Sequence, residues 1–236
     1  MKKHLITGTL FLIIFSANAQ FKRGAFSKDP ILNFENWDKQ RMYFGFYLGF
    51  NNYDFKIDYK SLPEIQVESS VGFSVGIVAD LRLAEYFNLR FEPGLYYAQR
   101  NLTYSNPAFT QQRDLLREVK STYINFPLLL KYSALRTGNV RPFLIGGLST
   151  SLNLSSNSRA EDDNLKQVFR MKSWTNNYEL GFGIDLYLEY FKFSPSIRGV
   201  FSLDDELIRD ADPNSPWTGN IESLKSRGVF VNFCFH

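Results

Sequence analysis

Alternation of apolar and polar residues, repeated in segments of about ten residues, is the feature that most constrains the fold. In residues 42–51, MYFGFYLGFN, the even positions are Met, Phe, Phe, Leu and Phe, and the odd positions are Tyr, Gly, Tyr, Gly and Asn. A strand directs alternate side chains to opposite faces, so one face of this segment is apolar and the other is small or polar. The pattern predicts a β-strand whose apolar face meets either a protein core or lipid.

The same alternation recurs seven more times along the chain. Short connections near residues 85, 138 and 189 alternate with long polar connections near 54–68, 103–119, 154–175 and 204–224. An even number of strands with short turns on one side and long loops on the other is typical of outer-membrane barrels. Residues 41–236 are therefore predicted to form an all-β, eight-stranded antiparallel transmembrane β-barrel. The further strands are expected at 71–83, 87–97, 122–132, 140–152, 178–188, 191–203 and 225–235.

The polar face of these segments carries charges of both signs, often two residues apart on one strand, as Asp80 and Arg82 are. Inside a small barrel such charges can pair across strands, as buried charges must. An eight-stranded barrel has room only for side chains or one small ligand, so we expect a packed lumen without an open channel. The predicted lumen charge network consists of Asp80, Arg82, Arg90, Glu92, Lys131, Glu179, Asp185, Lys192 and Arg198.

A soluble, lipocalin-like barrel is the alternative, with the apolar face inside and the charged face in water. Two features count against it. The apolar faces are large and uniform, and the polar faces use glycine and serine where a soluble sheet usually shows several Lys and Glu. The composition agrees with a strand-rich chain, since 23 Phe and 13 Tyr favour strands.

The beginning of the chain predicts export. Lys2 and Lys3 precede an apolar run over residues 5–15, and an Ala-x-Ala signal ends at Ala19. The run is too short for a comfortable spanning helix, so residues 1–19 are predicted to be a secretory signal peptide cleaved between Ala19 and Gln20. A buried N-terminal helix is the alternative. Residues 20–40 are expected to form a periplasmic segment acting as a plug, a tether or a docking arm, with both termini periplasmic.

Candidate catalytic and metal-binding residues are scarce. His4 leaves with the signal and His236 is the last residue, so no histidine is expected in a strand or loop to act as a general base. Cys234 is expected to be a small packed residue. The carboxylates at 161–163 and 204–206 and those of Asp210 and Asp212 match no known metal-binding loop and are expected to be solvated. We predict no enzyme activity, no cofactor, no metal and no small-molecule substrate.

Nucleic acid is not an expected partner, because 27 Lys and Arg are nearly balanced by 24 Asp and Glu and form no concentrated basic face. The expected surroundings are the lipids of the outer membrane. Residues 113–118, Arg-Asp-Leu-Leu-Arg-Glu, are expected to be either a helical turn above the membrane or a solvated loop.

Three stretches resemble the PorT (SprT) family. They are residues 36–40 (NWDKQ) followed by 43–51, residues 123–132 (YINFPLLLKY), and residues 141–147, which begin Arg-Pro-Phe and end Gly-Gly. The second stretch is shared by outer-membrane barrels more widely and indicates the fold, whereas the first is similar to PorT more narrowly.

The resemblance implies a non-catalytic integral outer-membrane component of the type IX secretion system. It implies a need for the protein in cargo export and, in gliding species, in motility, with other secretion subunits as partners. The alternatives are a surface adhesin, a porin-like barrel and a lipid-modifying enzyme.

Overall fold

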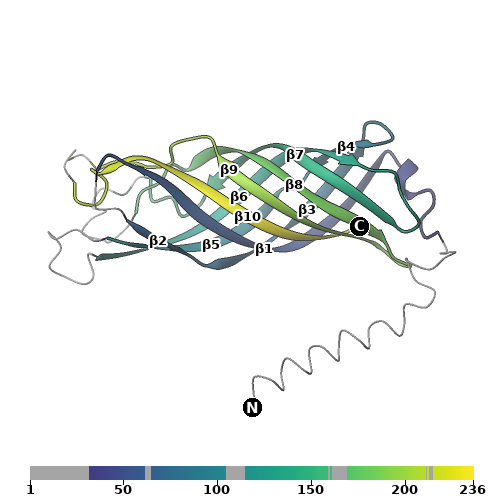
Figure 1. Cartoon of the computed structure of the whole chain (residues 1–236), viewed down its shortest axis with the longest axis horizontal. Coiled ribbons are helices and arrows are strands. Elements are labelled where there is room, and N and C mark those ends of the chain that lie inside the picture. The colour runs from purple at the N-terminus through teal and green to yellow at the C-terminus, as the bar shows by residue number, and fades with distance from the viewer. Residues whose placement is uncertain are drawn as a thin grey trace, which may run out of the picture.

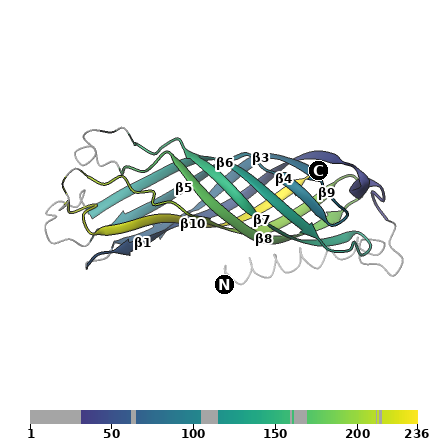
Figure 2. The same ribbon diagram turned by 90° about the horizontal axis from the view of Figure 1, so that it is seen from above.

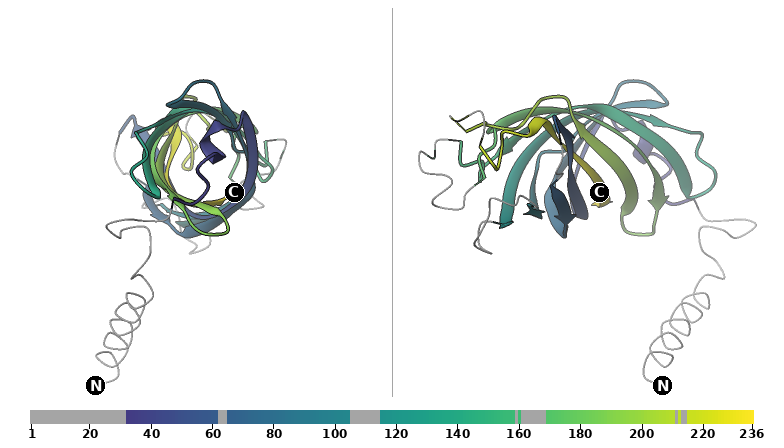
Figure 3. Two further views of the ribbon diagram at one scale, coloured as in Figure 1. Left: turned by 90° about the vertical axis from the view of Figure 1, so that its right-hand side faces the viewer. Right: turned by 60° about the vertical axis from the view of Figure 1, so that its left-hand side comes forward.

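The computed structural model describes residues 32–61, 65–104, 115–158, 160, 169–210, 212 and 215–236. These residues form one antiparallel sheet that closes on itself as an elongated barrel (Figure 1). The view from above shows the strands inclined to the long axis of the barrel (Figure 2). Seen along that axis, the strands form a closed ring (Figure 3). No helix in the described ranges is long and apolar enough to cross a membrane.

The sheet consists of strands that follow the predicted alternation. A short 3-10 helix, η2 (Trp37–Lys39), precedes them. The strands are β1 (Met42–Tyr59), β2 (Gln66–Ser69), β3 (Val71–Arg82), β4 (Phe87–Phe91), β5 (Gly94–Thr103), β6 (Leu116–Ser133), β7 (Val140–Asn153), β8 (Trp174–Tyr187), β9 (Lys192–Ser202) and β10 (Ile221–Phe235).

The wall is a ring of eight strands, because two of the eight are each interrupted once. β1 pairs with β10 on one side and with β3 on the other, which closes the ring. β4 and β5 both lie between β3 and β6 and are the two halves of one strand. The prediction of an eight-stranded antiparallel barrel is confirmed.

The interruption between β4 and β5 falls at Glu92 and Pro93, where the sequence predicts one continuous strand. Proline has no backbone N–H and cannot donate to a ladder, so strands interrupt or bulge at such positions. The Pro93 carbonyl still accepts a hydrogen bond from the Ile77 N–H at 3.1 Å. The strand therefore bends locally and keeps its place in the wall.

A second irregularity lies at Ser70, between β2 and β3. The pairs Ser69↔Arg100 and Ser74↔Tyr96 differ in register, as expected for a β-bulge. The β1–β3 ladder ends at the pair Asn52↔Val71, and no ladder joins β2 to β1 within the described residues. Beyond that pair, β1 is paired only with β10.

The outer face of the barrel is divided into two zones. Along β1, the outward residues from Met42 to Phe50 are all large, apolar and at least half exposed. Nine tilted residues at about 3.3 Å each cover a height of about 23 Å, close to the apolar band of outer-membrane barrels. Beyond Phe50 the outward residues become polar, as Lys56 on β1 and Arg227 on β10 show. We call the apolar zone the membrane band and the polar zone beyond it, built on the long-loop end, the collar.

The collar corrects the predicted loop boundaries. β1 continues to Tyr59 and β6 begins at Leu116, within stretches predicted as loops. In both, alternate side chains such as Phe55 and Val119 remain buried in the barrel while the outward ones are polar. The outward residues no longer signalled lipid, and the prediction wrongly ended the strands there. The apolar-out arrangement also excludes the lipocalin-like alternative.

Candidate functional site

The lumen of the membrane band holds charged side chains in place of an open channel. One group is a chain of ion pairs that starts at Asp80 and ends at Glu179. The Arg90 Nη2 atom lies 2.8 Å from Asp80 Oδ2, and Arg90 Nη1 lies 3.1 Å from Glu92 Oε1. Arg198 continues the chain, with Nη2 at 2.8 Å from Glu92 Oε2 and Nη1 at 3.3 Å from Glu179 Oε2.

A second group lies nearer the short-turn end and is centred on Asp185. The Lys131 Nζ lies 2.6 Å and the Lys192 Nζ lies 3.7 Å from Asp185 Oδ2. The Ser194 hydroxyl donates to Asp185 Oδ1 at 2.6 Å. The Lys131 ammonium lies 4.0 Å from the centroid of the Phe143 ring, and the Arg90 guanidinium lies 5.6 Å from the same centroid. Phe143 thus joins the two groups.

These two groups form the ionic core, and their charges cancel. The first has two arginines and three carboxylates, and the second has two lysines and one carboxylate. Moving an ion out of water costs several kcal/mol unless partners compensate it. Balanced pairing is therefore the condition under which this lumen can be packed. All eight members of the ionic core are at most 2% exposed, namely Asp80, Arg90, Glu92, Lys131, Glu179, Asp185, Lys192 and Arg198.

A layer of aromatic rings covers the ionic core on the side of the long loops. The Tyr47 hydroxyl donates to the Tyr96 hydroxyl at 2.8 Å. Tyr53 stacks on Tyr123 with ring centroids 5.1 Å apart, and Phe230 packs against both Tyr53 and Tyr96. Each of these side chains is at most 4% exposed, so the rings are packed in the lumen and shielded from solvent.

The next layer, at the level of the collar, pairs Arg100 with Glu206 through Ser226. Arg100 donates to the Ser226 hydroxyl at 3.1 Å and lies 3.8 Å above the Phe55 ring. The Ser226 hydroxyl donates to Glu206 Oε2 at 2.8 Å, and the Ser226 N–H donates to Glu206 Oε1 at 2.9 Å. Burial raises the pKa of Glu206, although the Ser226 hydrogen bonds and the charge of Arg100 oppose the shift.

An apolar cluster closes the lumen beneath the long loops. Its side chains come from β1, β5, β6, β10 and the connections that precede β6, β8 and β10, and each is less than 9% exposed. The cluster consists of Phe55, Leu102, Tyr104, Val119, Phe169, Met171, Leu207, Ile221 and Leu224. The lumen is thus filled by ionic, aromatic, mixed and apolar layers in succession.

The mouth at the short-turn end is covered by residues 32–41, which fold back into the ring (Figure 3). Trp37 of η2 packs against Phe34 with centroids 5.1 Å apart, and against Tyr43 of β1 at 5.9 Å. The Tyr187 hydroxyl donates to Asp38 Oδ1 at 2.5 Å. Residues 32–40 of this segment belong to the predicted 20–40 region, and we call residues 32–41 the plug.

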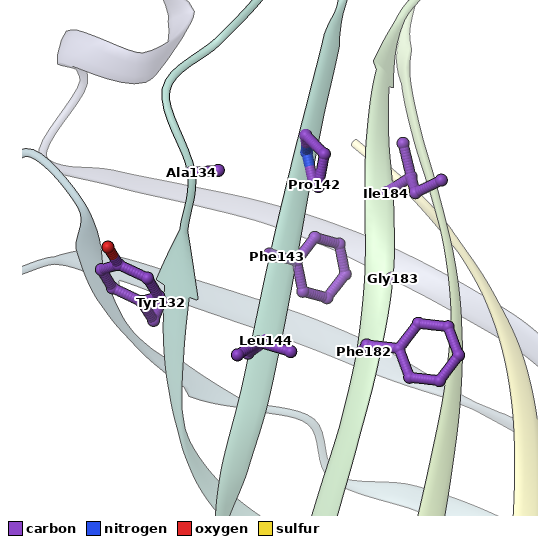
Figure 4. A pocket seen from close by; sticks show the side chains of 8 residues that line it. All are labelled: Tyr132, Ala134, Pro142, Phe143, Leu144, Phe182, Gly183 and Ile184. Atoms are coloured by element: carbon purple, nitrogen blue, oxygen red, sulfur yellow. The ribbon is translucent and has the colours of Figure 1, made fainter.

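An apolar hollow lies on the outer wall, between β6, β7 and β8 (Figure 4). Its volume is about 460 Å³. Gly183 is a buried position that faces the lumen, where a Cβ on it would lie 2.4 Å from the Phe143 ring. Apart from the Tyr132 phenol no lining residue is titratable, so the hollow offers no acid–base chemistry. The lining residues are Tyr132, Ala134, Pro142, Phe143, Leu144, Phe182, Gly183 and Ile184.

Of the nine residues of the predicted charge network, the structure brings eight together and places Arg82 apart. Arg82 is the last residue of β3 and is half-buried at the rim. Its Nη1 donates to the Lys39 carbonyl at 3.4 Å. The alternation places it on the inward face, but the strand ends before the lumen encloses it. The predicted cleavage residues Ala19 and Gln20 lie outside the described residues.

The two candidate nucleophile and base positions lie inside the barrel. Cys234 is a fully buried free cysteine on β10. His236 pairs its backbone with Lys192 and sets its ring edge-to-face on Tyr43 at 5.3 Å. His236 is one residue beyond the end of β10, and its backbone pairing with Lys192 places it at the mouth of the barrel. Within the described ranges, no group of three or more His, Cys, Asp or Glu could hold a metal ion.

Sequence reasoning missed three buried charged residues at the level of the collar. Glu206 was expected to be solvated and is 1% exposed, and Arg117 was expected in a turn or loop and is 2% exposed. Arg100 lies just beyond the predicted end of its strand and is fully buried. For Arg117 the sequence does contain a signal, because Arg117, Val119, Ser121 and Tyr123 continue the inward alternation of β6. Glu206 had none, since it belongs to no strand.

A closed ring of tilted strands with an apolar outer band and a charge-balanced interior defines the class of outer-membrane β-barrels. Within that class, residues 18–207 match the family described as the outer membrane protein beta-barrel domain. The chain belongs to this family and is an integral outer-membrane barrel.

The solved structures to which the chain is similar include three outer-membrane proteins that are distant in sequence. OprG from Pseudomonas aeruginosa is 16% identical with a TM-score of 0.46, over 81% of this chain and 94% of that one. The outer membrane protein AlkL is 13% identical with a TM-score of 0.41, over 81% and 87%. Ail, the attachment invasion locus protein of Yersinia pestis, is 8% identical with a TM-score of 0.34, over 83% and 98%. No curated protein matches the sequence.

Proposed function

We propose that this protein is a closed, non-catalytic outer-membrane barrel that serves the type IX secretion system as a scaffold for other subunits. In this proposal the signal peptide 1–19 is removed between Ala19 and Gln20, and both termini and the short turns face the periplasm. The collar and the long loops then face the exterior. The partners are secretion subunits and the lipids of the outer membrane, and in gliding species the same role supports motility.

The filled lumen is the observation that carries the scaffold role. Charged, aromatic, mixed and apolar layers follow one another from the short turns to the long loops. A barrel of this kind offers no continuous water path for solutes. The parts of the barrel that remain available for binding are its surfaces. These are the lipid-facing wall, the short turns, and the long loops at the end of the collar.

The secretion assignment is supported by the resemblance of residues 36–40 and 43–51 to the PorT family, whereas residues 123–132 resemble outer-membrane barrels more widely. In the structure, residues 36–40 belong to the plug, and residues 43–51 belong to β1. The plug connects the barrel to the chain that precedes it. This arrangement suits a component that holds a periplasmic partner close to the barrel.

Deleting the gene tests this function. We expect secreted cargo to accumulate in the periplasm and disappear from the medium, since an incomplete translocon cannot pass cargo across the outer membrane. The measurement is immunoblotting of cargo in both fractions, with the wild-type gene restored on a plasmid as the control. Normal secretion by the deletion strain would remove the secretion role and leave the barrel assignment intact.

A surface adhesin or porin-like barrel is the second candidate, and the collar with its long loops favours its adhesin form. Solute flux separates the porin form from the closed barrel. We expect liposomes containing the purified protein to swell in arabinose no faster than empty liposomes, because the layers block the lumen. A general porin reconstituted in parallel is the control. Swelling at a porin-like rate would favour the porin-like candidate.

A further inference from the structure

The mouth at the short-turn end contains two arginines that the barrel itself holds in place. Arg141 donates from Nε to the Ala134 carbonyl at 2.9 Å and from Nη2 to the Glu85 carbonyl at 2.8 Å. Arg136 donates from Nε to the Gly138 carbonyl at 2.8 Å, and its guanidinium lies 3.7 Å above the Tyr187 ring. None of these contacts involves residues 32–41. The two guanidinium groups are therefore positioned whether or not the plug is seated.

The carboxylate of Asp38 forms ion pairs with both arginines. Asp38 Oδ1 lies 3.5 Å from Arg141 Nη1, and Asp38 Oδ2 lies 3.7 Å from Arg136 Nη1. Within the described residues, no other carboxylate forms an ion pair with either arginine. The Arg136, Arg141 and Asp38 side chains are 15%, 10% and 21% exposed, so removing the Asp38 carboxylate while residues 32–41 stay seated would leave two largely buried cations without a counter-charge.

The same mouth also binds the peptide backbone of the plug. Arg136 donates from Nη1 to the Phe34 carbonyl at 3.2 Å and from Nη2 to the Asn33 carbonyl. The Asn33 N–H donates to Asn139 Oδ1 at 2.9 Å, and Asn33 Nδ2 donates to the Tyr187 carbonyl at 3.0 Å. Two consecutive carbonyls and a carboxylate a few residues later are thus recognised together. That combination belongs to a polypeptide rather than to a free small acid.

We propose that this mouth is a carboxylate-binding site for a polypeptide, and that Asp38 occupies it in cis. Arg136, Arg141 and the Tyr187 hydroxyl form the receptor, and residues 32–41 are its resident ligand. An acidic segment of a partner on the same side of the membrane exchanges with the resident segment and releases it. Arg136 and Arg141 keep a counter-charge throughout this exchange only if the incoming chain supplies a carboxylate. This inference does not depend on the secretion role.

Chemical rescue of the full-length protein tests the site. We expect Asp38→Gly to lower the melting temperature of the barrel in detergent, because it removes the counter-charge and leaves room for a small anion. Sodium acetate should restore a large part of the loss, and sodium chloride at equal ionic strength should not. The double variant Asp38→Gly with Arg141→Gln should show no rescue, since the receptor is then incomplete. Rescue by chloride as well as acetate, or no rescue by acetate, would overturn the proposal.

Two further comparisons keep this test decisive. Asp54→Gly is the matched control, because Asp54 also pairs with an arginine, Arg227 at 2.7 Å, but at an exposed site where acetate should have no effect. Asp38→Ser replaces Asp38→Gly if the glycine variant does not fold. A labelled peptide of residues 32–41 should bind the double variant Trp37→Ala with Asp38→Gly, and the same peptide with Asn at position 38 should bind about tenfold more weakly. Equal binding of the two peptides would contradict carboxylate recognition.

Discussion

Replacing Arg198 with methionine should destabilise the barrel by about 3–5 kcal/mol, the cost typical of removing one partner from a buried ion pair. Arg198 is 1% exposed and contacts both Glu92 and Glu179. Without it, the ionic core has one more carboxylate than it has cations, and Glu179 loses its ion pair with Arg198. The measurement is urea-induced unfolding in lipid vesicles. Gels monitor it through the difference in mobility between the folded and the heat-denatured barrel.

Two variants show whether charge balance is the cause. Adding Glu179→Gln to Arg198→Met should recover part of the loss, because the core is neutral again and the Gln can still accept the hydrogen bond that Asn125 gives to Glu179 at 3.0 Å. Arg82→Met is the matched control, since Arg82 is an arginine of the same inward face that lies outside the ionic core. We expect an effect within about 0.5 kcal/mol for it. Equal losses for Arg198 and Arg82 would refute the role of the core.

Replacing Gly72 with alanine should cost about 3 kcal/mol or prevent folding, at the upper end of overpacking effects. A Cβ on Gly72 would lie 1.8 Å from the Tyr97 carbonyl oxygen and 2.7 Å from Asn51 Oδ1. The first of these is a backbone atom of β5, so β3 and β5 would have to separate. The unfolding midpoint in urea and the folded fraction after refolding into vesicles measure the effect.

Gly146 of β7 provides the control for the glycine effect. The nearest atoms to a Cβ at that position are Leu180 Cδ1 at 3.2 Å and the Glu179 carbonyl oxygen at 3.4 Å. The flexible Leu180 side chain can move away from the added Cβ. Alanine also reduces the conformational freedom of the unfolded chain relative to glycine, which favours the folded state. We expect Gly146→Ala to change stability by less than about 0.5 kcal/mol. A similar large loss at both positions would mean that strand glycines matter for a reason other than this close contact.

The architecture of the membrane band was predictable because two requirements act on the same residues. Lipid demands apolar side chains on one face, and a narrow lumen demands small or paired polar ones on the other, so Met42–Phe50 alternates without exception. In the collar only the inward face is constrained, and the outward face is ordinary protein surface. The strands there carry a weaker signal, which is why β1 and β6 were predicted too short.

Partner choice inside the lumen was not predictable from the sequence. Arg90 and Glu92 lie two residues apart, but Arg198 reaches Glu92 only because the tilt of the wall brings β9 and β4 to the same height across the lumen. The pairing of Asp38 with Arg136 and Arg141 depends on a chain reversal before β1 that no local pattern specifies. Glu206 illustrates the same limit, since its burial depends on how a connection folds over the end of the barrel.

The collar separates the long loops from the membrane band. Strands continue for roughly 20 Å past the last outward phenylalanine of β1, at about 3.3 Å per residue along a tilted path. Its outer surface is wetted by water, while its interior is still packed with side chains. Whatever docks on the loop tips therefore meets them well clear of the headgroups, and sequence drift in those tips leaves the spanning wall undisturbed.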